Sequence, residues 1–163
     1  MRRLFLGSLM LLQCAAAEAG QLTMNDPAIR VVASVKQMRD YCGVDGTYDA
    51  CTQFVSFKLE ASCSAEGTSW RIRTAAALTP SIVLYNLGSL RHENAHIADM
   101  TGSVTHYMSA IEAQQFASPD LCRDHASAVM SGFGIAVRTF ARESLDLRDP
   151  TTRPSRTDRA RQR

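Results

Sequence analysis

Residues 88–116, GSLRHENAHIADMTGSVTHYMSAIEAQQF, carry the pattern that decides the fold. Large apolar residues recur in this stretch every seven positions, at Leu90, Ile97, Val104 and Ile111. Two turns of an α-helix take about seven residues, so this spacing keeps the four side chains on one side of a helix. The stretch therefore predicts a long amphipathic helix that packs its apolar face against the rest of the chain.

A second helix is predicted from about 119 to 145. Ser118 and Pro119 are typical of a helix start, because serine caps the first amides and proline fits the first turn. Apolar residues then recur at helical spacing as far as Phe140. The turn between the two helical segments is short, so they are predicted to form an antiparallel hairpin.

The residues before these helices favour strands. In residues 52–62 the side chains nearly alternate, which places Val55, Phe57 and Leu59 on one predicted face. Residues 69–78 alternate in the same way until Thr79–Pro80, which is expected to interrupt the strand. The predicted fold class is therefore α+β, with a small antiparallel sheet followed by an antiparallel helical hairpin.

The first nineteen residues are typical of a secretory signal peptide. Two arginines precede the apolar run LFLGSLMLL at 4–12, which is too short to span a bilayer. The triplet AEA at 17–19 has the small residues of a cleavage site, so cleavage is expected near Ala19. Lipid attachment at Cys14 fits less well, because the bulky Gln13 precedes it. The mature protein is therefore predicted to be secreted or periplasmic, without a transmembrane segment.

The mature chain keeps four cysteines, at positions 42, 51, 63 and 122. An even number of cysteines in an oxidising compartment predicts two disulfides. Three pairings are possible, and the spacing does not choose among them. A four-cysteine zinc site is disfavoured, because the chain has no CxxC pair.

The chain is long enough for a single domain, predicted over 20–147, with a β-rich part (20–85) and a helical part (86–147). The residues 148–163 hold many arginines and no large apolar side chain, so they are predicted to form a disordered basic tail. A formal charge of +2 and an aromatic content of 7% do not suggest nucleic-acid binding.

The motif HENAH lies near the start of the first predicted helix. His92 and His96 are one turn apart, a spacing that lets two imidazoles bind one tetrahedral ion. Glu93 lies beside them and can act as a general base. This is the HExxH arrangement of zinc metalloproteases, in which the metal activates a water molecule and the glutamate takes its proton. The two histidines are predicted to lie opposite the apolar stripe; the competing interpretation is a coincidental match.

A third zinc ligand is needed, and Glu143 is the leading candidate. If the turn between the helices centres near residue 118, position 92 faces roughly position 143. Positions 129, 133, 136, 140 and 143 would then form a single stripe on the second helix. The alternative for Glu143 is a solvated helix-end glutamate.

Asp99 and His106 are the other candidates for the third ligand. Asp99 lies about 4.5 Å further along the helix axis than His96, and we expect it to orient a histidine or hold a water molecule. His106 is about 15 Å from His96 on a continuous helix and could bind metal only if the helix broke at Gly102. Because Gly102 stands where metzincins have their third histidine, that family is excluded.

The segment LRHENAHI, Cys122 and, more weakly, LDLRDPTT resemble a bacterial family of secreted zinc-dependent proteases. That family is catalogued as domain of unknown function 922, and the resemblance covers roughly Cys63 to Thr152. The resemblance implies a zincin-like fold and a peptidase activity. The chain departs from the family's closing pattern, since it has Leu145–Asp146 and Arg153–Pro154 in place of a Tyr-Asp and a His-Gly.

The predicted function is that of an exported zinc-dependent metallohydrolase, most simply a peptidase acting on a peptide or protein substrate. The alternative is a disulfide-stapled periplasmic protein that binds a metal or a partner without catalysis. A third interpretation is a structural helical hairpin in which HENAH has no metal.

Overall fold

The structure is a computed structural model that describes residues 20–42 and 49–148. Its elements are β1 (Gln21–Met24), β2 (Ala28–Val31), α1 (Val35–Cys42), β3 (Ala50–Glu66), β4 (Ser69–Leu84), the short 3-10 helix η1 (Leu87–Ser89), α2 (Leu90–Glu112) and α3 (Pro119–Arg148). The predicted signal peptide and the residues 149–163 of the predicted tail lie outside the described residues. Arg148, where the tail was expected to begin, is still helical. Within the described part, no helix combines the length and apolar character that crossing a membrane requires.

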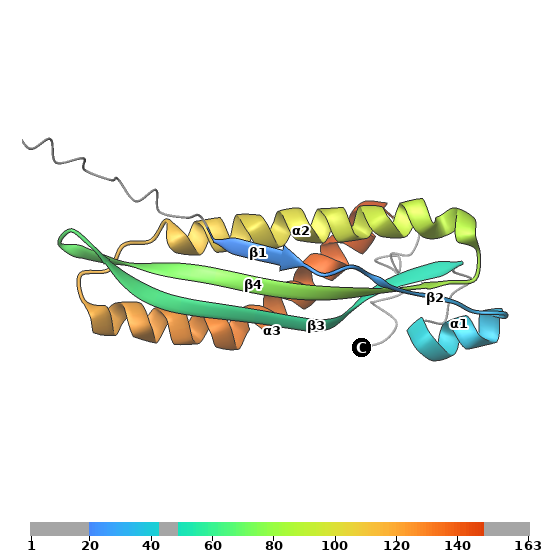
Figure 1. Cartoon of the computed structure of the whole chain (residues 1–163), viewed down its shortest axis with the longest axis horizontal. Coiled ribbons are helices and arrows are strands. Elements are labelled where there is room, and N and C mark those ends of the chain that lie inside the picture. The colour runs from blue at the N-terminus through green and yellow to red at the C-terminus, as the bar shows by residue number, and fades with distance from the viewer. Residues whose placement is uncertain (1–19, 43–48, 149–163) are drawn as a thin grey trace, which may run out of the picture.

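The strands β3 and β4 form a long antiparallel hairpin that runs along the molecule (Figure 1). They are 17 and 16 residues long and are joined by a tight turn. Gly67 in this turn has a φ of 62°, a backbone conformation that glycine adopts without steric cost. Both segments that alternate in the sequence are therefore strands, as predicted.

The sheet as a whole is mixed, so the prediction of an antiparallel sheet is correct only for the β3–β4 pair. The strands β1 and β2 lie one after the other along the opposite edge of β4 and run parallel to it. Parallel neighbours cannot be joined by a tight turn, and here the chain passes through α1 and β3 before it returns as β4. Side-chain alternation does not report strand direction, which is why the sequence did not reveal this.

The predicted interruption at Thr79–Pro80 is wrong, because β4 continues through it to Leu84. Proline has no N–H for the sheet, and β3 has a bulge opposite it, where Phe54 faces Pro80 and Ser56 faces Thr79. The extra residue, Val55, is 62% exposed, whereas Phe54 packs against the core. After the bulge, the side chains predicted to share the core-facing side of β3, Phe57 and Leu59, do face the core. Before the bulge, the core-facing residue is Phe54, one position earlier than the predicted Val55.

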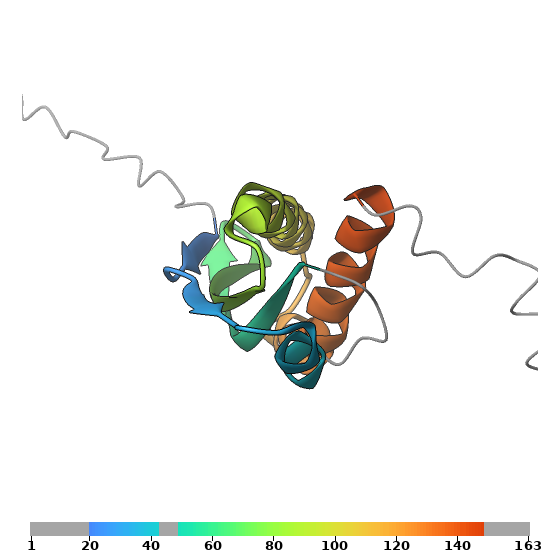
Figure 2. The same ribbon diagram turned by 90° about the vertical axis from the view of Figure 1, so that its right-hand side faces the viewer.

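The helices α2 and α3 form the predicted antiparallel hairpin and cover one face of the sheet, with α2 mainly over β4 and α3 mainly over β3 (Figure 2). Apolar side chains from these four elements make the main core: Leu59, Ile72, Ala76, Leu78, Met100, Val104, Met108, Ile111, Cys122, Ala126, Val129, Phe133 and Val137. The seven-residue repeat therefore identified the helix and two of its core residues, Val104 and Ile111, whereas Leu90 and Ile97 are only partly buried.

Two disulfides are present, as the even number of cysteines predicts. Cys42–Cys51 joins α1 to β3, and Cys63–Cys122 joins β3 to α3.

The helix α1 lies within the part of the chain expected to be β-rich. It packs Met38 into a second, smaller core with Ile82 and Leu84 at the end of β4, against which Leu90 and Ile97 of α2 also pack. This second core fixes the start of α2, where the HENAH motif lies.

Candidate metal centre

His92, Glu93 and His96 gather in the first two turns of α2. One potential ligand atom from each residue lies within 4.8 Å of the others, so the group could hold a metal ion. The two Nε2 atoms are 3.1 Å apart, and the imidazole rings meet edge to face at 89°. Two nitrogens bound to one tetrahedral zinc ion at its usual bond length lie about 3.3 Å apart. The two histidines therefore fit the spacing of a shared metal ion.

The prediction that both histidines lie opposite the buried face of α2 is wrong for His96. His96 is 6% exposed and Glu93 is 4% exposed, and both continue the row of buried side chains that includes Met100 and Val104. Because α2 packs against the sheet and against α3 at once, its buried arc is wider than its apolar stripe. His92 is the more exposed of the two histidines. The site thus lies at the end of the core, with one ligand inside and one nearer to solvent.

A chain of hydrogen bonds from α3 fixes the second histidine. The Nδ1 atom of His96 lies 2.8 Å from the hydroxyl oxygen of Ser144, and that hydroxyl donates to Asp99 at 3.1 Å. Arg148 donates to the same carboxylate, with one bond of 2.7 Å. The Arg148 guanidinium holds the pKa of Asp99 below its usual range, and the hydrogen bond from Ser144 acts in the same direction. Asp99 is therefore ionised at neutral pH.

This chain decides which nitrogen of His96 carries the proton. An ionised carboxylate can only accept hydrogen bonds, so the single hydroxyl proton of Ser144 points to Asp99. The Ser144 oxygen must then accept the bond from the His96 Nδ1–H group. In neutral His96 the lone pair is consequently on Nε2, the atom that faces His92. This is the tautomer that a metal ligand needs, and such outer hydrogen bonds are typical of metal-binding histidines.

Ser144 is not arranged as a nucleophile. In a serine hydrolase the histidine lies between the serine and the carboxylate and takes the serine proton. Here the serine lies between His96 and Asp99, and its side chain is only 3% exposed. Ser144 therefore orients a histidine and does not attack a substrate.

Glu93 is held from the sheet by Thr52 of β3. The Thr52 hydroxyl oxygen lies 2.7 Å from Oε2 of Glu93 and 3.3 Å from the backbone carbonyl oxygen of the same residue. Glu93 also lies in the first turn of α2, where the helix dipole favours a negative charge. Thr52 follows Cys51 directly, so the disulfide to α1 supports the same point of β3. The helix α2 and the strand β3 thus fix the Glu93 carboxylate beside the two histidines.

The structure does not bring Glu143 to the histidines. Its side chain is exposed, and the next residue, Ser144, is the one that contacts His96. The predicted stripe on the second helix drifted because the count followed a seven-residue period, while an α-helix has 3.6 residues per turn. The two deeply buried residues Phe133 and Val137 mark the core-facing side of α3. Around the helix axis, Ser144 points within about 20° of both, whereas Glu143 points about 80° and 120° away from them.

The other two candidates for the third ligand also lie outside the group. Asp99 bonds to Ser144 and Arg148, which places it in the chain that orients His96. His106 is exposed, and α2 is continuous through Gly102. Among the histidine, cysteine, aspartate and glutamate side chains that the structure describes, Glu93 is the one that groups with the two histidines.

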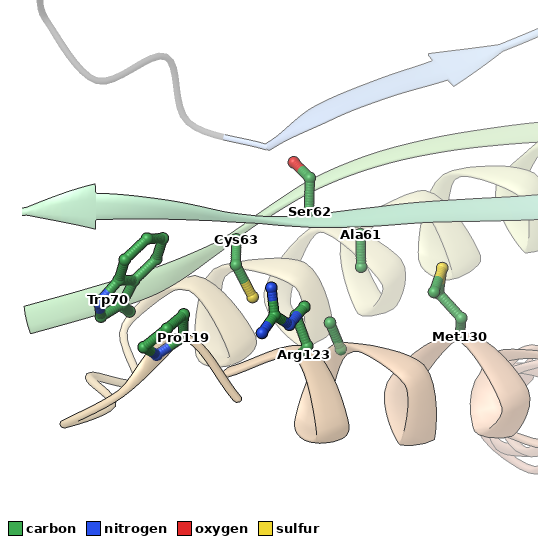
Figure 3. Close-up of a pocket in the computed structure, with 8 residues that line it drawn as sticks. Ala61, Ser62, Cys63, Trp70, Pro119, Arg123 and Met130 are labelled. Carbon is green, nitrogen blue, oxygen red and sulfur yellow. The ribbon is translucent and has the colours of Figure 1, made fainter. Parts of the chain in front are cut away.

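A cavity of about 350 Å³ lies far from the histidines, between β3, the start of β4 and the start of α3. Figure 3 shows Trp70, Pro119, Arg123 and Met130 around it, next to Cys63. Ala61 in its wall is nine residues along β3 from Thr52, which is about 30 Å in a strand. The cavity therefore belongs to the opposite end of the molecule and takes no part in the metal centre.

No family model, curated protein or solved structure matches the chain. Membership of the protease family that LRHENAHI resembles therefore stays a prediction. The functional inference depends on the positions of His92, His96 and Glu93 and on the hydrogen bonds that orient them.

Proposed function

We propose that the protein is an exported zinc-dependent metallohydrolase, in which His92 and His96 bind the ion and Glu93 is the general base. The observation that carries the proposal is the pair of Nε2 atoms 3.1 Å apart, next to the buried Glu93. Since the hydrogen bond to Ser144 puts the lone pair of His96 on Nε2, one ligand is in the binding state before the metal arrives.

Zinc is the metal that best suits this donor set. Imidazole nitrogens bind zinc well, and the spacing of the two atoms fits a tetrahedral ion. A bound zinc ion would lower the pKa of a water molecule and polarise a carbonyl group. The remaining positions are open to a third ligand that the described residues do not assign and to solvent or substrate.

Glu93 has the position and surroundings of a proton carrier. Its carboxylate lies beside the histidine nitrogens, so it can accept a proton from the attacking water and return it to the leaving amine. Thr52 holds Oε2, which keeps the carboxylate from turning away from the histidines. The buried surroundings exclude most other water, so proton transfer has few competing acceptors.

A peptide is the substrate class that the nearby sheet supports best. In the described part of the chain, β3 pairs only with β4, so its other edge keeps backbone groups that can bind an extended peptide. This edge includes the segment around Thr52, next to Glu93. The resemblance to the secreted protease family supports the same class, and the two disulfides suit an oxidising compartment.

Metal analysis of protein purified without a histidine tag tests the binding site. We expect close to one zinc ion per chain in the wild type and a loss of zinc in His96→Ala. His106→Ala is the matched control, because His106 is exposed on the same helix and lies outside the group. Protein that is free of metal and takes up no added zinc at neutral pH would show that HENAH is a coincidental match.

Hydrolysis is tested separately with Glu93→Gln. This variant should keep its zinc, because Glu93 is not a proposed ligand, and should lose nearly all cleavage of casein or a peptide library. If the zinc-loaded wild type cleaves no substrate, the protein is the non-catalytic metal-binding alternative. Residual activity in Glu93→Gln equal to the wild type would remove Glu93 from its proposed role.

A further inference from the structure

The other end of α2 holds a buried carboxylate whose partners are unusual. Glu112, the last residue of α2, is more than nine-tenths buried. Its Oε1 atom accepts two bonds of 2.7 Å from Thr74, one from the backbone N–H and one from the hydroxyl. Its Oε2 atom accepts a bond of 2.9 Å from the backbone nitrogen of Gly20. Gly20, directly before β1, is thus bound to a buried acid.

The position of Gly20 is fixed from both sides. The strand β1 begins at the next residue, and Gln21 pairs with Ala75 of β4, so Gly20 lies next to Thr74. A Cβ atom at position 20 would lie 2.5 Å from the Thr74 hydroxyl oxygen and 2.8 Å from a carboxylate oxygen of Glu112. Because these distances are shorter than ordinary Cβ contacts, a side chain at position 20 would force the Thr74 hydroxyl and the Glu112 carboxylate to move, whereas glycine brings its nitrogen to Glu112 without that shift.

Glu112 lacks a positive partner among the described residues. The bonds to it come from backbone and hydroxyl groups, and the ion pairs between the described residues do not include it. A buried carboxylate without a cation is costly, and the carboxyl end of a helix adds to the cost because its dipole is negative there. The site therefore calls for a positive charge near Oε2, where the Gly20 nitrogen lies.

We propose that the Ala19–Gly20 peptide bond is hydrolysed during export and that the new α-ammonium group of Gly20 forms a buried ion pair with Glu112. Ala17 and Ala19 are the small residues of the pattern that a signal peptidase recognises. Water adds across the C–N bond, which leaves a carboxylate on Ala19 and an amine on Gly20 that is protonated at neutral pH. The proposal rests on the export part of the proposed function and not on hydrolysis or metal binding.

The pair links maturation to stability. Before cleavage, the Gly20 nitrogen is a neutral amide and can give Glu112 only a hydrogen bond. After cleavage, the same nitrogen carries a full charge at the same place. The mature chain should therefore hold β1 and the end of α2 together more tightly than the precursor does.

The first measurement is the intact mass of the protein recovered from the periplasm or medium after expression of the full chain with export. The expected mass is that of residues 20–163, less four hydrogen atoms for the two disulfides. An amino terminus at another residue would overturn the proposed cleavage.

The second measurement isolates the charge, on protein prepared with Gly20 as its first residue. Acetylation of the Gly20 amine removes the charge and keeps one N–H donor, as in the uncleaved peptide bond. In urea unfolding at pH 7, we expect acetylation to raise the unfolding equilibrium constant about 10- to 100-fold. In Glu112→Gln the same acetylation should change it less than about 2-fold. A small effect of acetylation with Glu112 present, or equal effects in both backgrounds, would overturn the ion pair.

A labelling experiment decides the matter if Glu112→Gln does not fold. An amine-reactive reagent should modify Gly20 at least about 10-fold more slowly in the folded protein than in urea, because a buried, paired ammonium is neither accessible nor deprotonated. The exposed amine of Lys36 is the internal control and should differ far less. Equal protection of the two amines would contradict the proposal. This outcome is independent of zinc and of activity, so it is distinguishable from a failure of the proposed function.

Discussion

Ser144 is the residue on which the chemistry of His96 depends. It is buried and uncharged and gives no sign of function in the sequence, yet its hydroxyl sets the tautomer of the histidine. Ser144→Ala should weaken zinc binding about 10- to 100-fold, since outer hydrogen bonds to a metal-binding histidine have effects of that size. Competition with a zinc-binding dye measures the change. Ser131→Ala, at an exposed position on the same helix, is the control and should bind zinc as the wild type does.

Thr52 has the corresponding role for Glu93. Thr52→Val keeps the shape of the side chain and removes the donor, which leaves a buried carboxylate oxygen without its bond. We expect the free energy of unfolding to fall by about 1–3 kcal/mol, as measured by urea unfolding of the metal-free protein. Ser56→Ala, at an exposed position of the same strand, should change it by less than about 0.5 kcal/mol. Equal losses in the two variants would mean that the bond to Glu93 contributes nothing special.

At this scale the sequence predicted the pair of histidines, the nearby glutamate and the role of Asp99 in orienting a histidine, but not Ser144 or Thr52. A motif within one turn of a helix is local, so its geometry follows from the helix alone. Ser144 and Thr52 reach the site through tertiary packing, 48 and 41 residues away from their partners. Glu143 was favoured because a helix position was extrapolated over many turns, and an error of one residue rotates a side chain by about 100°.

The disulfides allow a comparison between elements. Cys63 and Cys122 are 59 residues apart, and Cys42 and Cys51 are 9 apart. A disulfide that closes a longer loop restricts the unfolded chain more. Replacing Cys63 and Cys122 by serine should therefore lower the free energy of unfolding by about 4 kcal/mol, and replacing Cys42 and Cys51 should lower it by about 2.5 kcal/mol. Thermal or urea unfolding of the two double variants gives the order. The reverse order would show that strain or local packing outweighs loop closure.

The helices were easier to predict than the sheet, for physical reasons. Both helices repeat their apolar residues over many turns, so one residue that departs from the pattern does not hide the helical period. In β3 the extra residue of the bulge, Val55, exchanges the two faces of the strand. Because strand side chains alternate with a period of two, a single inserted residue moves every side chain on one side of it to the opposite face. The strands β1 and β2 have four residues each and form only because β4 offers them an edge. No local pattern could reveal a partner that lies fifty residues away.

For the whole molecule, the proposed metal is a ligand of the folded state alone. The two histidine nitrogens meet only when α2 is formed and Ser144 of α3 is in place, so zinc should stabilise the fold. At a free zinc concentration 100 times the dissociation constant, the gain is about 2.7 kcal/mol. A chelator should therefore lower the melting temperature by roughly 10 °C in scanning calorimetry. His96→Ala should show no chelator effect, and an equal shift in that variant would place the metal elsewhere.

The position of β4 has a consequence for how the chain reaches its fold. Every other described strand hydrogen-bonds to β4 and to no other strand, yet β4 is the last of them to be synthesised. While residues 20–66 emerge from the ribosome, they meet no completed edge and cannot assemble into a sheet. The two helices that cover the core come later still. Such an order leaves residues 20–66 without a folded sheet until β4 has followed them, and the proposed export through a translocation channel would require an unfolded chain of this kind.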